Sequence, residues 1–433
     1  MLNKITFYTE EEKDINQNHE CYDGTLKVDI TGYSDLFFTK SAGFKFNNWA
    51  WTETAPLVFN SKNNNAYALI PSSKTIYQPI NTGKTVMDEY AFDNTGSHMV
   101  TRSENINKGT AYQIKPKELG NQTYWRRNYY GVFDAYRKNG NFVAVIHGEN
   151  KNDAFSINGE KLYYNNSIEP ISRKYNDNEY SGRDSEGVYH DSPKHYFAFV
   201  GLSSCREDEL QGDDSLMIND RGPITWPEFG YIDENGNSRG CGLRHPSIFC
   251  NDEYVYITYL EQSENGGTKI IRAKKDKDGF PCEFYKYSQG DFTQNALPRD
   301  FNKNDTAFLK MPSGNSVDIL GMSKCKTMRF HIAKITGTDL FLGVQEMFHP
   351  LGYITVVLRV SRDLVHWSKY TELPNMRFAK WHLGMLHYPR IVNARFETVS
   401  EIDPKNFYII GTALSPVTGA DETQAVQLSI EII

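Results

Sequence analysis

Short apolar runs dominate the chain, and turns rich in Asn, Asp, Gly and Ser separate them. Four stretches share one pattern, in which an apolar run, a turn and a second apolar run follow one another: 131–149, 244–261, 330–346 and 387–412. Paired apolar runs of this length around a turn are typical of β-hairpins, and long helical periodicity is not found. The pattern therefore predicts four hairpins.

Further apolar runs follow the first three hairpins, at 196–204, 269–273 and 354–361. Each unit then has three or four antiparallel strands, as a propeller blade has, so the pattern predicts an all-β, propeller-like chain. The units are unevenly spaced, which inserted loops such as 150–191 explain. We assign blades to residues 121–433, whereas residues 1–120 either complete the ring or form an appended β module.

Composition restricts the classes of partner and of function that we expect. The 433 residues carry a net charge of −7, which argues against nucleic acid as a partner, because phosphate binding needs basic patches. No apolar run is long enough to span a membrane. Residues 1–20 are polar and unlike a signal peptide, so we expect a cytoplasmic protein or one whose leader has been removed. Aromatic residues make up 13% of the chain, which suits strand packing and also the faces of sugar rings.

Three short motifs resemble those of a known superfamily. Residues Ser361–Trp367 match the Ser-x-Asp-Leu-x-x-Trp strand ending of five-bladed β-propeller glycosidases, the arabinanase/xylosidase-like and invertase/levansucrase-like enzymes. Residues Arg244–Phe249 resemble their Arg-Asp-Pro-x-x-Phe blade opening, with His245 in place of Asp, and Phe133-Asp134 is similar to another acidic opening. The resemblance covers about residues 125–433. It implies a divergent member with a five-bladed β-propeller that hydrolyses an oligo- or polysaccharide.

The resemblance also implies a catalytic set. Enzymes of this superfamily use three carboxylates, and Asp134 is the one that carries over directly. His245 stands where the second Asp is expected, and Phe330-His331 stands where a Glu would open the third blade. We therefore expect Asp134 to be the residue on which catalysis depends most.

Hairpin geometry offers further carboxylates. The start of one strand and the end of its partner lie at the same rim, so each inner strand opening is expected beside a Glu. The expected pairs are Asp134 with Glu149, His245 with Glu261, and His331 with Glu346. Sugar hydrolysis needs one protonated and one ionised carboxyl group, which Asp134 with Glu149 or Glu346 would supply. The alternative is that these Glu residues are solvated strand ends.

The remaining candidates bind substrate in this hypothesis. His147 either faces a ligand with Glu149 or lies in a β-bulge, and Gly148 indicates a close backbone approach. Metal binding by His245 and His331 has no spacing rule behind it, and no CxxC pair occurs, so we expect no metal and no cofactor. Three further candidates open strands: Tyr388 as the counterpart of Asp134, and Arg244 and Arg390, which either hold an acidic sugar or pair with a Glu.

Two alternatives to the hydrolase remain. A non-catalytic carbohydrate-binding propeller that has lost part of the acidic triad would explain the histidines at 245 and 331. A sialidase-like, six-bladed propeller ranks last, because Ser361–Trp367 lacks the Gly and Thr that precede Trp in its Asp-box.

Overall fold

A computed structural model describes the chain in segments. Seven early strands are described within 26–116, and the rest of the description covers residues 125, 129–150, 155–157, 160–162, 197–206, 215–234, 242–262, 266–303, 305–321, 327–348, 353–378, 386–394, 397–414 and 421–432. Side chains of the early strands are described only at 26–31.

The four predicted hairpins are confirmed, and each begins an antiparallel group of strands. The first group is β8 (Tyr129–Lys138), β9 (Asn141–Asn150), β12 (Phe197–Arg206) and β13 (Ser215–Pro223). The second is β14 (Gly242–Cys250), β15 (Tyr254–Gln262), β16 (Gly267–Lys275), β17 (Pro281–Ser288) and β18 (Asp291–Asn295). The third is β19 (Thr327–Ile335), β20 (Phe341–Phe348), β21 (Ile354–Ser361) and β22 (Thr371–Phe378).

The fourth group joins the two ends of the sequence. Strands β23 (His387–Asn393), β25 (Phe407–Leu414) and β26 (Asp421–Ile432) form a meander, and β1 (Leu26–Leu36) adds to it by pairing with β26. A fifth group contains β2 (Leu57–Asn60), β3 (Ala66–Ile70), β4 (Ile76–Ile80) and β7 (Tyr112–Pro116), and its strand β7 runs parallel to β13.

A few short elements complete the described part. Strand β24 (Glu401–Ile402) pairs with β19, and two small hairpins are β5 (Tyr90–Phe92) with β6 (Met99–Thr101) and β10 (Phe155–Ile157) with β11 (Glu160–Leu162). The helical residues of the described part are the 3₁₀ turn η8 (Thr306–Lys310) and Trp125. The prediction of an all-β chain is confirmed for this part.

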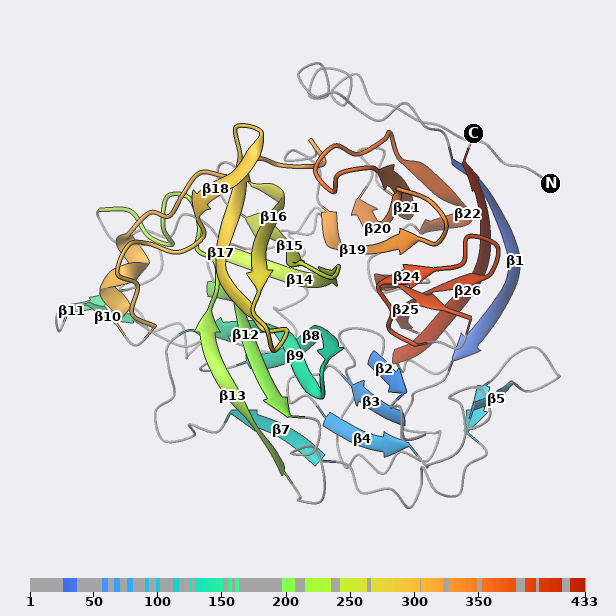
Figure 1. Cartoon of the computed structure of the whole chain (residues 1–433), viewed down its shortest axis with the longest axis horizontal. Helices are drawn as coiled ribbons and strands as arrows, with labels where there is room; N and C mark the ends of the chain where they lie inside the picture. Colours follow the sequence, from blue (N-terminus) through green and yellow to red (C-terminus); the bar gives the residue numbers. More distant parts are fainter. Residues whose placement is uncertain are drawn as a thin grey trace, which may run out of the picture.

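The groups lie around a common centre, with β1 and β26 on the outside (Figure 1). Apolar layers fill the space between neighbouring groups. One layer joins the first and second groups, another the second and third, and another the third and fourth. Burial on both faces explains why a strand such as the fully buried β21 reads as a nearly continuous apolar stretch.

The motif Ser361–Trp367 is a self-contained turn. The hydroxyl of Ser361 accepts the backbone N–H groups of Asp363 and Leu364. The Asp363 carboxylate accepts the backbone N–H groups of Val365 and His366. The turn directs Trp367 onto Phe330, at 4.8 Å between ring centroids. The motif thus fastens the end of β21 to the start of β19, which is a structural role.

The close packing of Trp125 explains why a glycine occupies position 148. A Cβ at Gly148 would lie 2.6 Å from the Trp125 carbonyl, and one at Gly201 would lie 2.7 Å from the Trp125 ring. The close approach expected at Gly148 is therefore confirmed, and its partner is a fully buried indole. Strand β9 pairs without a register shift through His147 and Gly148, so the alternative of a bulge at His147 is wrong.

We predict that Gly201→Ala destabilises the protein by about 1–3 kcal/mol, because the added methyl overpacks the Trp125 ring. Urea denaturation of Gly201→Ala, Trp125→Leu and the double variant measures this. Leu lacks the ring atoms that contact Gly201, so the double variant should lose less stability than the two single losses together. Strictly additive losses would contradict the proposed clash.

Candidate active site

All four inner strands depart from regular pairing near their first residues. Register shifts lie between Val132 and Asp134 in β8, between Arg244 and Ser247 in β14, between Thr327 and Phe330 in β19, and between His387 and Arg390 in β23. Bulges of this kind re-aim side chains and are common beside active sites. The described inner strands therefore share one irregular end, which is where we looked for a site.

Two bulge residues have strained backbones. His245 and Tyr388 have φ values of 51° and 52°, in the left-handed region that side chains other than glycine rarely adopt. Their strands are not neighbours, yet their rings lie 4.8 Å apart, and the Tyr388 hydroxyl is 3.2 Å from Nε2 of His245. Phe133, the bulged residue of β8, packs against both rings. Three bulges thus converge on one cluster of rings.

The ring cluster links two carboxylates. Glu149 contacts Nε2 of His147 at 2.9 Å, and the His147 ring is stacked 5.9 Å from that of His245. At the other end, the Tyr388 ring lies 3.8 Å from the His387 ring, and His387 Nδ1 is 2.7 Å from Glu346. The continuous sequence of contacts is Glu149, His147, His245, Tyr388, His387 and Glu346.

Hydrogen bonds orient the rings and carboxylates of the cluster. Nδ1 of His147 accepts the backbone N–H of His245 at 3.4 Å, which leaves Nε2 of His147 to donate to Glu149. Glu346 accepts both His387 Nδ1 and the Tyr388 N–H through the same oxygen.

His245 is neutral. Burial, followed by the positive charge of Arg244, holds the pKa of His245 well below its usual value. Its Nε2 contacts Tyr388, whereas its buried Nδ1 has no hydrogen-bond partner among the residues that the structure describes. An imidazole nitrogen in that position is suited to a polar group of a ligand.

Asp134 lies in a different environment from the one expected. It pairs with Val145, whereas Glu149 pairs with Tyr129, so Asp134 and Glu149 are four residues, or about 13 Å, apart along β9. The expectation that these two carboxyls lie close at one rim is wrong. The reason is the bulge at Phe133, which turns Phe133 to the ring cluster and leaves Asp134 in the packed interior.

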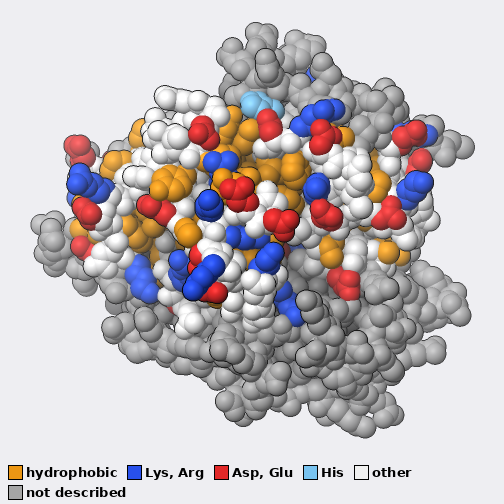
Figure 2. Space-filling model, viewed as in Figure 1, with side chains coloured by type: hydrophobic (Ala, Val, Ile, Leu, Met, Phe, Trp, Pro, Cys, Tyr) orange, Lys and Arg blue, Asp and Glu red, His pale blue; other side chains and the backbone are white. Residues whose placement is uncertain are grey.

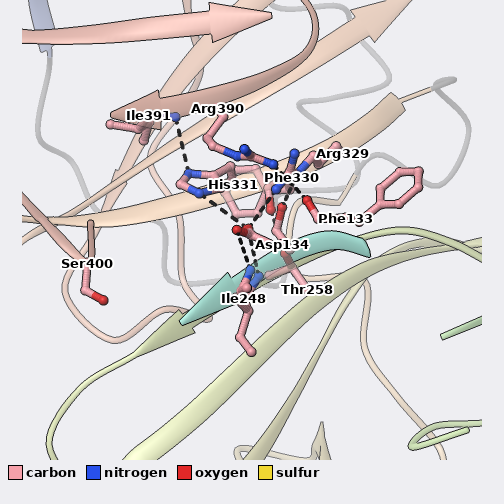
Figure 3. Close-up of polar contacts among 12 residues, drawn as sticks. Phe133, Asp134, Ile248, Thr258, Arg329, Phe330, His331, Arg390, Ile391 and Ser400 are labelled. Carbon is pink, nitrogen blue, oxygen red and sulfur yellow. Dashed lines mark hydrogen bonds and ion pairs between the residues drawn. The ribbon is translucent and has the colours of Figure 1, made fainter. Parts of the chain in front are cut away.

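The Asp134 carboxylate is the centre of a buried charge network (Figure 3). One oxygen accepts the Ala135 N–H, and the other accepts the Ile248 N–H and Nη2 of Arg329 at 2.7 Å. His331 approaches the second oxygen at 3.5 Å. Burial alone would raise the pKa of Asp134, but Arg329, Arg390 and these donors outweigh it and hold the pKa below its usual value. Asp134 is therefore a buried, hydrogen-bonded carboxylate, and its expected role as the catalytic base stays a prediction.

His331 and Arg390 belong to the same network. Nδ1 of His331 accepts the Ile391 N–H, and burial lowers the pKa of His331 to about 3, so the ring is neutral. Arg390 donates to the Phe133 carbonyl at 2.8 Å. Arg390 thus bonds to the backbone of Phe133, whose ring packs in the cluster, and His331 bonds to the backbone of Ile391.

The last two candidates lie at the end of β14 and β15. Arg244 donates to Gln262 at 3.0 Å, and Glu261 accepts the Glu228 N–H at 3.2 Å. Glu261 also raises the pKa of Lys286 by its charge, although burial dominates and lowers that pKa to about 8. Lys286 is held by the Trp226 carbonyl and the Ser313 hydroxyl. Glu261 is buried and acts on the charge of Lys286, so the alternative of a solvated strand end is wrong for Glu261.

Sequence reasoning missed two contributors to these clusters, Arg329 and His387. Each immediately precedes a residue that the hairpin pattern selected, Phe330 and Tyr388. The sequence feature that could have identified them is a basic residue directly before an aromatic residue at the start of a strand. The bulge at that point then directs the basic side chain toward the centre of the structure.

Other chemistry is limited in the described part. Its residues contain no helix with the length and apolar character to cross a membrane, and no group of three His, Cys, Asp or Glu side chains placed to hold a metal. On the face seen in Figure 2, acidic, basic and apolar side chains are interspersed over the described residues.

The solved structures that match the chain include glycoside hydrolases, whereas no protein-family model and no curated protein matches it. A GH62 α-L-arabinofuranosidase catalytic domain from Coprinopsis cinerea has 9% identity and a TM-score of 0.44, covering 92% of this chain and 97% of its own. An α-L-arabinanase from Cellvibrio cellulosa has 10% identity and a TM-score of 0.41, covering 89% and 91%. A thermostable family-43 glycoside hydrolase has 9% identity and a TM-score of 0.41, covering 96% and 92%.

The expected resemblance to arabinanase-type glycosidases is thus confirmed as a distant one. At this level of similarity, the function has to be argued from the residues of this chain.

We predict that Asp134→Asn destabilises the protein by about 3–5 kcal/mol, because it leaves the buried Arg329 guanidinium without its counter-charge. Asp339→Asn is the control, since its exposed pair with Arg362 should cost less than about 1 kcal/mol. The folded pKa of Asp134 lies below 3.8, so its contribution is complete above that pH and shrinks as the pH falls further. Unfolding free energies from urea titrations at pH 7 and pH 3 measure both effects; normal stability with lost activity would restore Asp134 to a catalytic role.

Lys286 should make the stability of the protein rise with pH. Its folded pKa is about 8 and its ordinary value is 10.5, so between these limits the unfolded state binds one more proton. Stability from this group therefore increases from pH 8 to pH 10.5, by about 1.4 kcal/mol per pH unit at most. Urea unfolding from pH 7 to pH 10.5 should show this rise in the wild type and in Lys274→Met, an exposed control, but not in Lys286→Met. Parallel profiles for all three proteins would refute the assignment.

Proposed function

We propose that this chain is a glycoside hydrolase with a five-bladed β-propeller fold, which acts on an oligo- or polysaccharide at the bulged ends of its inner strands. The observation that carries the proposal is the sequence of contacts from Glu149 through four rings to Glu346. Hydrolysis of a glycosidic bond needs two carboxyl groups in different protonation states, set apart by a surface that holds the sugar.

The described strands divide into five antiparallel groups, three of which are joined into one sheet through the parallel pairs β12–β14 and β13–β7. Each of the four groups that start with a bulged strand would be one blade, and the group of β2, β3, β4 and β7 would be the fifth. Residues 1–120 would then belong to the propeller rather than to an appended module. Strand β1 would close the ring by completing the blade of β23, β25 and β26, so that the two ends of the sequence share one sheet.

The two carboxylates are assigned by their partners. Glu346, which accepts two donors through one oxygen, is the ionised base or nucleophile in this mechanism. Glu149, which accepts Nε2 of His147, is the general acid that protonates the leaving oxygen. His147 and His387 hold these carboxylates in position, as partners of catalytic groups commonly do.

Sugar binding would use the faces and edges of the rings. Phe133 and Tyr388 supply the flat apolar surfaces that sugar faces prefer, and the unpaired Nδ1 of His245 accepts or donates a hydrogen bond to a hydroxyl group. Arg244, beside His245 in β14, would hold a polar substituent. Asp134, His331 and Arg390 support the bulges from below and do not touch the sugar.

A carbohydrate-binding propeller without catalysis is the second candidate. A specific observation favours it: His245 and Phe330-His331 occupy positions where the resembling enzymes carry acids, and His245 is held neutral. The same ring cluster would then bind sugar without cleaving it.

The test is a glycan panel, including arabinan and α-arabinofuranosides, on the wild type and three variants. Glu149→Gln and Glu346→Gln should each lower kcat at least about a hundredfold without loss of fold, because a positioned acid or base contributes that much. Glu261→Gln is the matched control, since it is a third strand-end Glu whose partners are structural. It should keep kcat within about threefold of the wild type.

The outcomes separate the candidates. Full activity in Glu149→Gln and Glu346→Gln would remove both residues from the mechanism. A wild type that cleaves nothing but binds a glycan in calorimetry, with weaker binding in His245→Ala, would establish the binding propeller instead.

A further inference from the structure

Two large apolar side chains are exposed in the part of the chain that the structure describes, Phe229 at 40% and Met311 at 41%. They belong to two loops that lie against each other, one after β13 and one after the 3₁₀ turn η8. A Cβ at Gly230 would lie 2.9 Å from the Leu309 carbonyl oxygen and 3.0 Å from that of Met311. We call the surface formed by Phe229 and Met311 the outer platform.

Hydrogen bonds fasten the two loops of the outer platform to each other. The backbone N–H of Tyr231 donates to the Leu309 carbonyl at 2.8 Å. The indole of Trp226 is fully buried and donates to the Phe308 carbonyl at 3.1 Å, which roots both loops in the core. The outer platform is thus preorganised, and a ligand binds such a surface with little loss of conformational entropy in the protein.

The loop of Phe229 lies on the same face as the candidate active site. The preceding residue, Glu228, donates its backbone N–H to the Glu261 carboxylate at 3.2 Å. Glu261 stands near the end of β15, as Glu149 does in β9 and Glu346 in β20, so the loop is anchored at equivalent strand ends. Strand β15 lies one strand outward from the inner strand β14, and η8 lies further from the centre (Figure 1). The outer platform therefore continues outward from the ring cluster along the second group of strands.

The size and the edges of the outer platform suit a sugar ring better than a protein. With two-fifths of each side chain exposed, Phe229 and Met311 present an apolar area on the order of 150 Å². A stable protein partner would cover about 800 Å². Each apolar residue follows a charged one, Glu228 and Lys310, whose carboxylate and ammonium groups can bond to hydroxyl groups. An apolar surface with polar groups beside it matches a sugar, which has apolar faces and hydroxyl groups at its rim.

We propose that the outer platform is a subsite for a polysaccharide chain, at which a sugar unit remote from the cleaved bond stacks on Phe229. Its assignment as a subsite of the enzyme rests on the proposed hydrolase function. It specifies the substrate class as a polymer whose chain runs from the ring cluster past Glu228 and over Phe229. Binding energy from such a remote unit helps to hold the reacting unit in place, so a polymer binds more tightly than a short oligosaccharide.

Binding to polymers and to short sugars tests the outer platform. Native gels that contain arabinan, xylan or galactan measure polymer affinity, and calorimetry with the matching trisaccharides measures binding at the ring cluster. Phe229→Ala should weaken binding to the polymer that retards the wild type about tenfold more than it weakens trisaccharide binding, because it removes one ring from a sugar face. Phe229→Tyr keeps the ring and should bind as the wild type does. Tyr285→Ala is the matched control, since it removes an aromatic residue whose hydroxyl binds the exposed Glu283, and it should change neither affinity.

The outcomes separate the outer platform from the hydrolase site. A wild type that no polymer retards, or equal polymer affinity in Phe229→Ala and the wild type, would overturn the subsite and leave the ring cluster untouched. If His245→Ala leaves trisaccharide binding and cleavage unchanged while Phe229→Ala releases the polymer, the proposed active site fails and the outer platform remains as a glycan-binding surface. Self-association of the wild type in sedimentation velocity, abolished by Phe229→Ala, would identify a second copy as the occupant and refute the proposal.

Discussion

The ion pair between Asp134 and Arg329 holds the centre of this structure together. It joins β8 to β19, while the same carboxylate accepts a backbone N–H of β14 and Arg329 reaches Ser247 in that strand. Three strands from three groups are therefore tied by one buried carboxylate. Apolar layers fill the spaces between groups, but apolar contacts are not directional. The hydrogen bonds of Asp134 and Arg329 are directional, so they fix how the inner strands are placed relative to one another.

The bulges follow from this constraint. A regular strand sends successive side chains to opposite faces, so a strand that must give Asp134 to the interior cannot also give Phe133 to the axis without a local change of register. The extra residue in each inner strand provides that change. The bulges place two residues, His245 and Tyr388, in the left-handed backbone region, and the surrounding structure has to offset the resulting strain.

Much of the fold could be predicted from the sequence, because hairpins depend on local pattern. The apolar runs on either side of the Asn139-Gly140 turn, and of the turns in the three equivalent hairpins, became β8–β9, β14–β15, β19–β20 and β23–β25. The site could be predicted only in part. His147, Glu149, His245, Tyr388 and Glu346 were selected and do meet. Asp134 was selected for its place in a motif, but its burial depends on a one-residue bulge at Phe133, which the sequence pattern does not encode. Arg329 was missed because a lone arginine before an aromatic has no pattern of its own.

Two layers of side chains lie near the axis, the network around Asp134 below and the ring cluster with its two carboxylates above, and they carry opposite charge. The lower layer carries Asp134 with two buried arginines, so it is positive and closed to substrate. The upper layer carries two carboxylates, each held by an imidazole, with neutral rings between them. Burial, followed by the positive charge of Arg244, keeps the imidazole of His245 neutral, and a neutral imidazole can stand between two carboxylates without pairing with either as a cation. The two carboxylates proposed as acid and base, Glu149 and Glu346, thus lie on either side of an uncharged ring, each held by its own histidine.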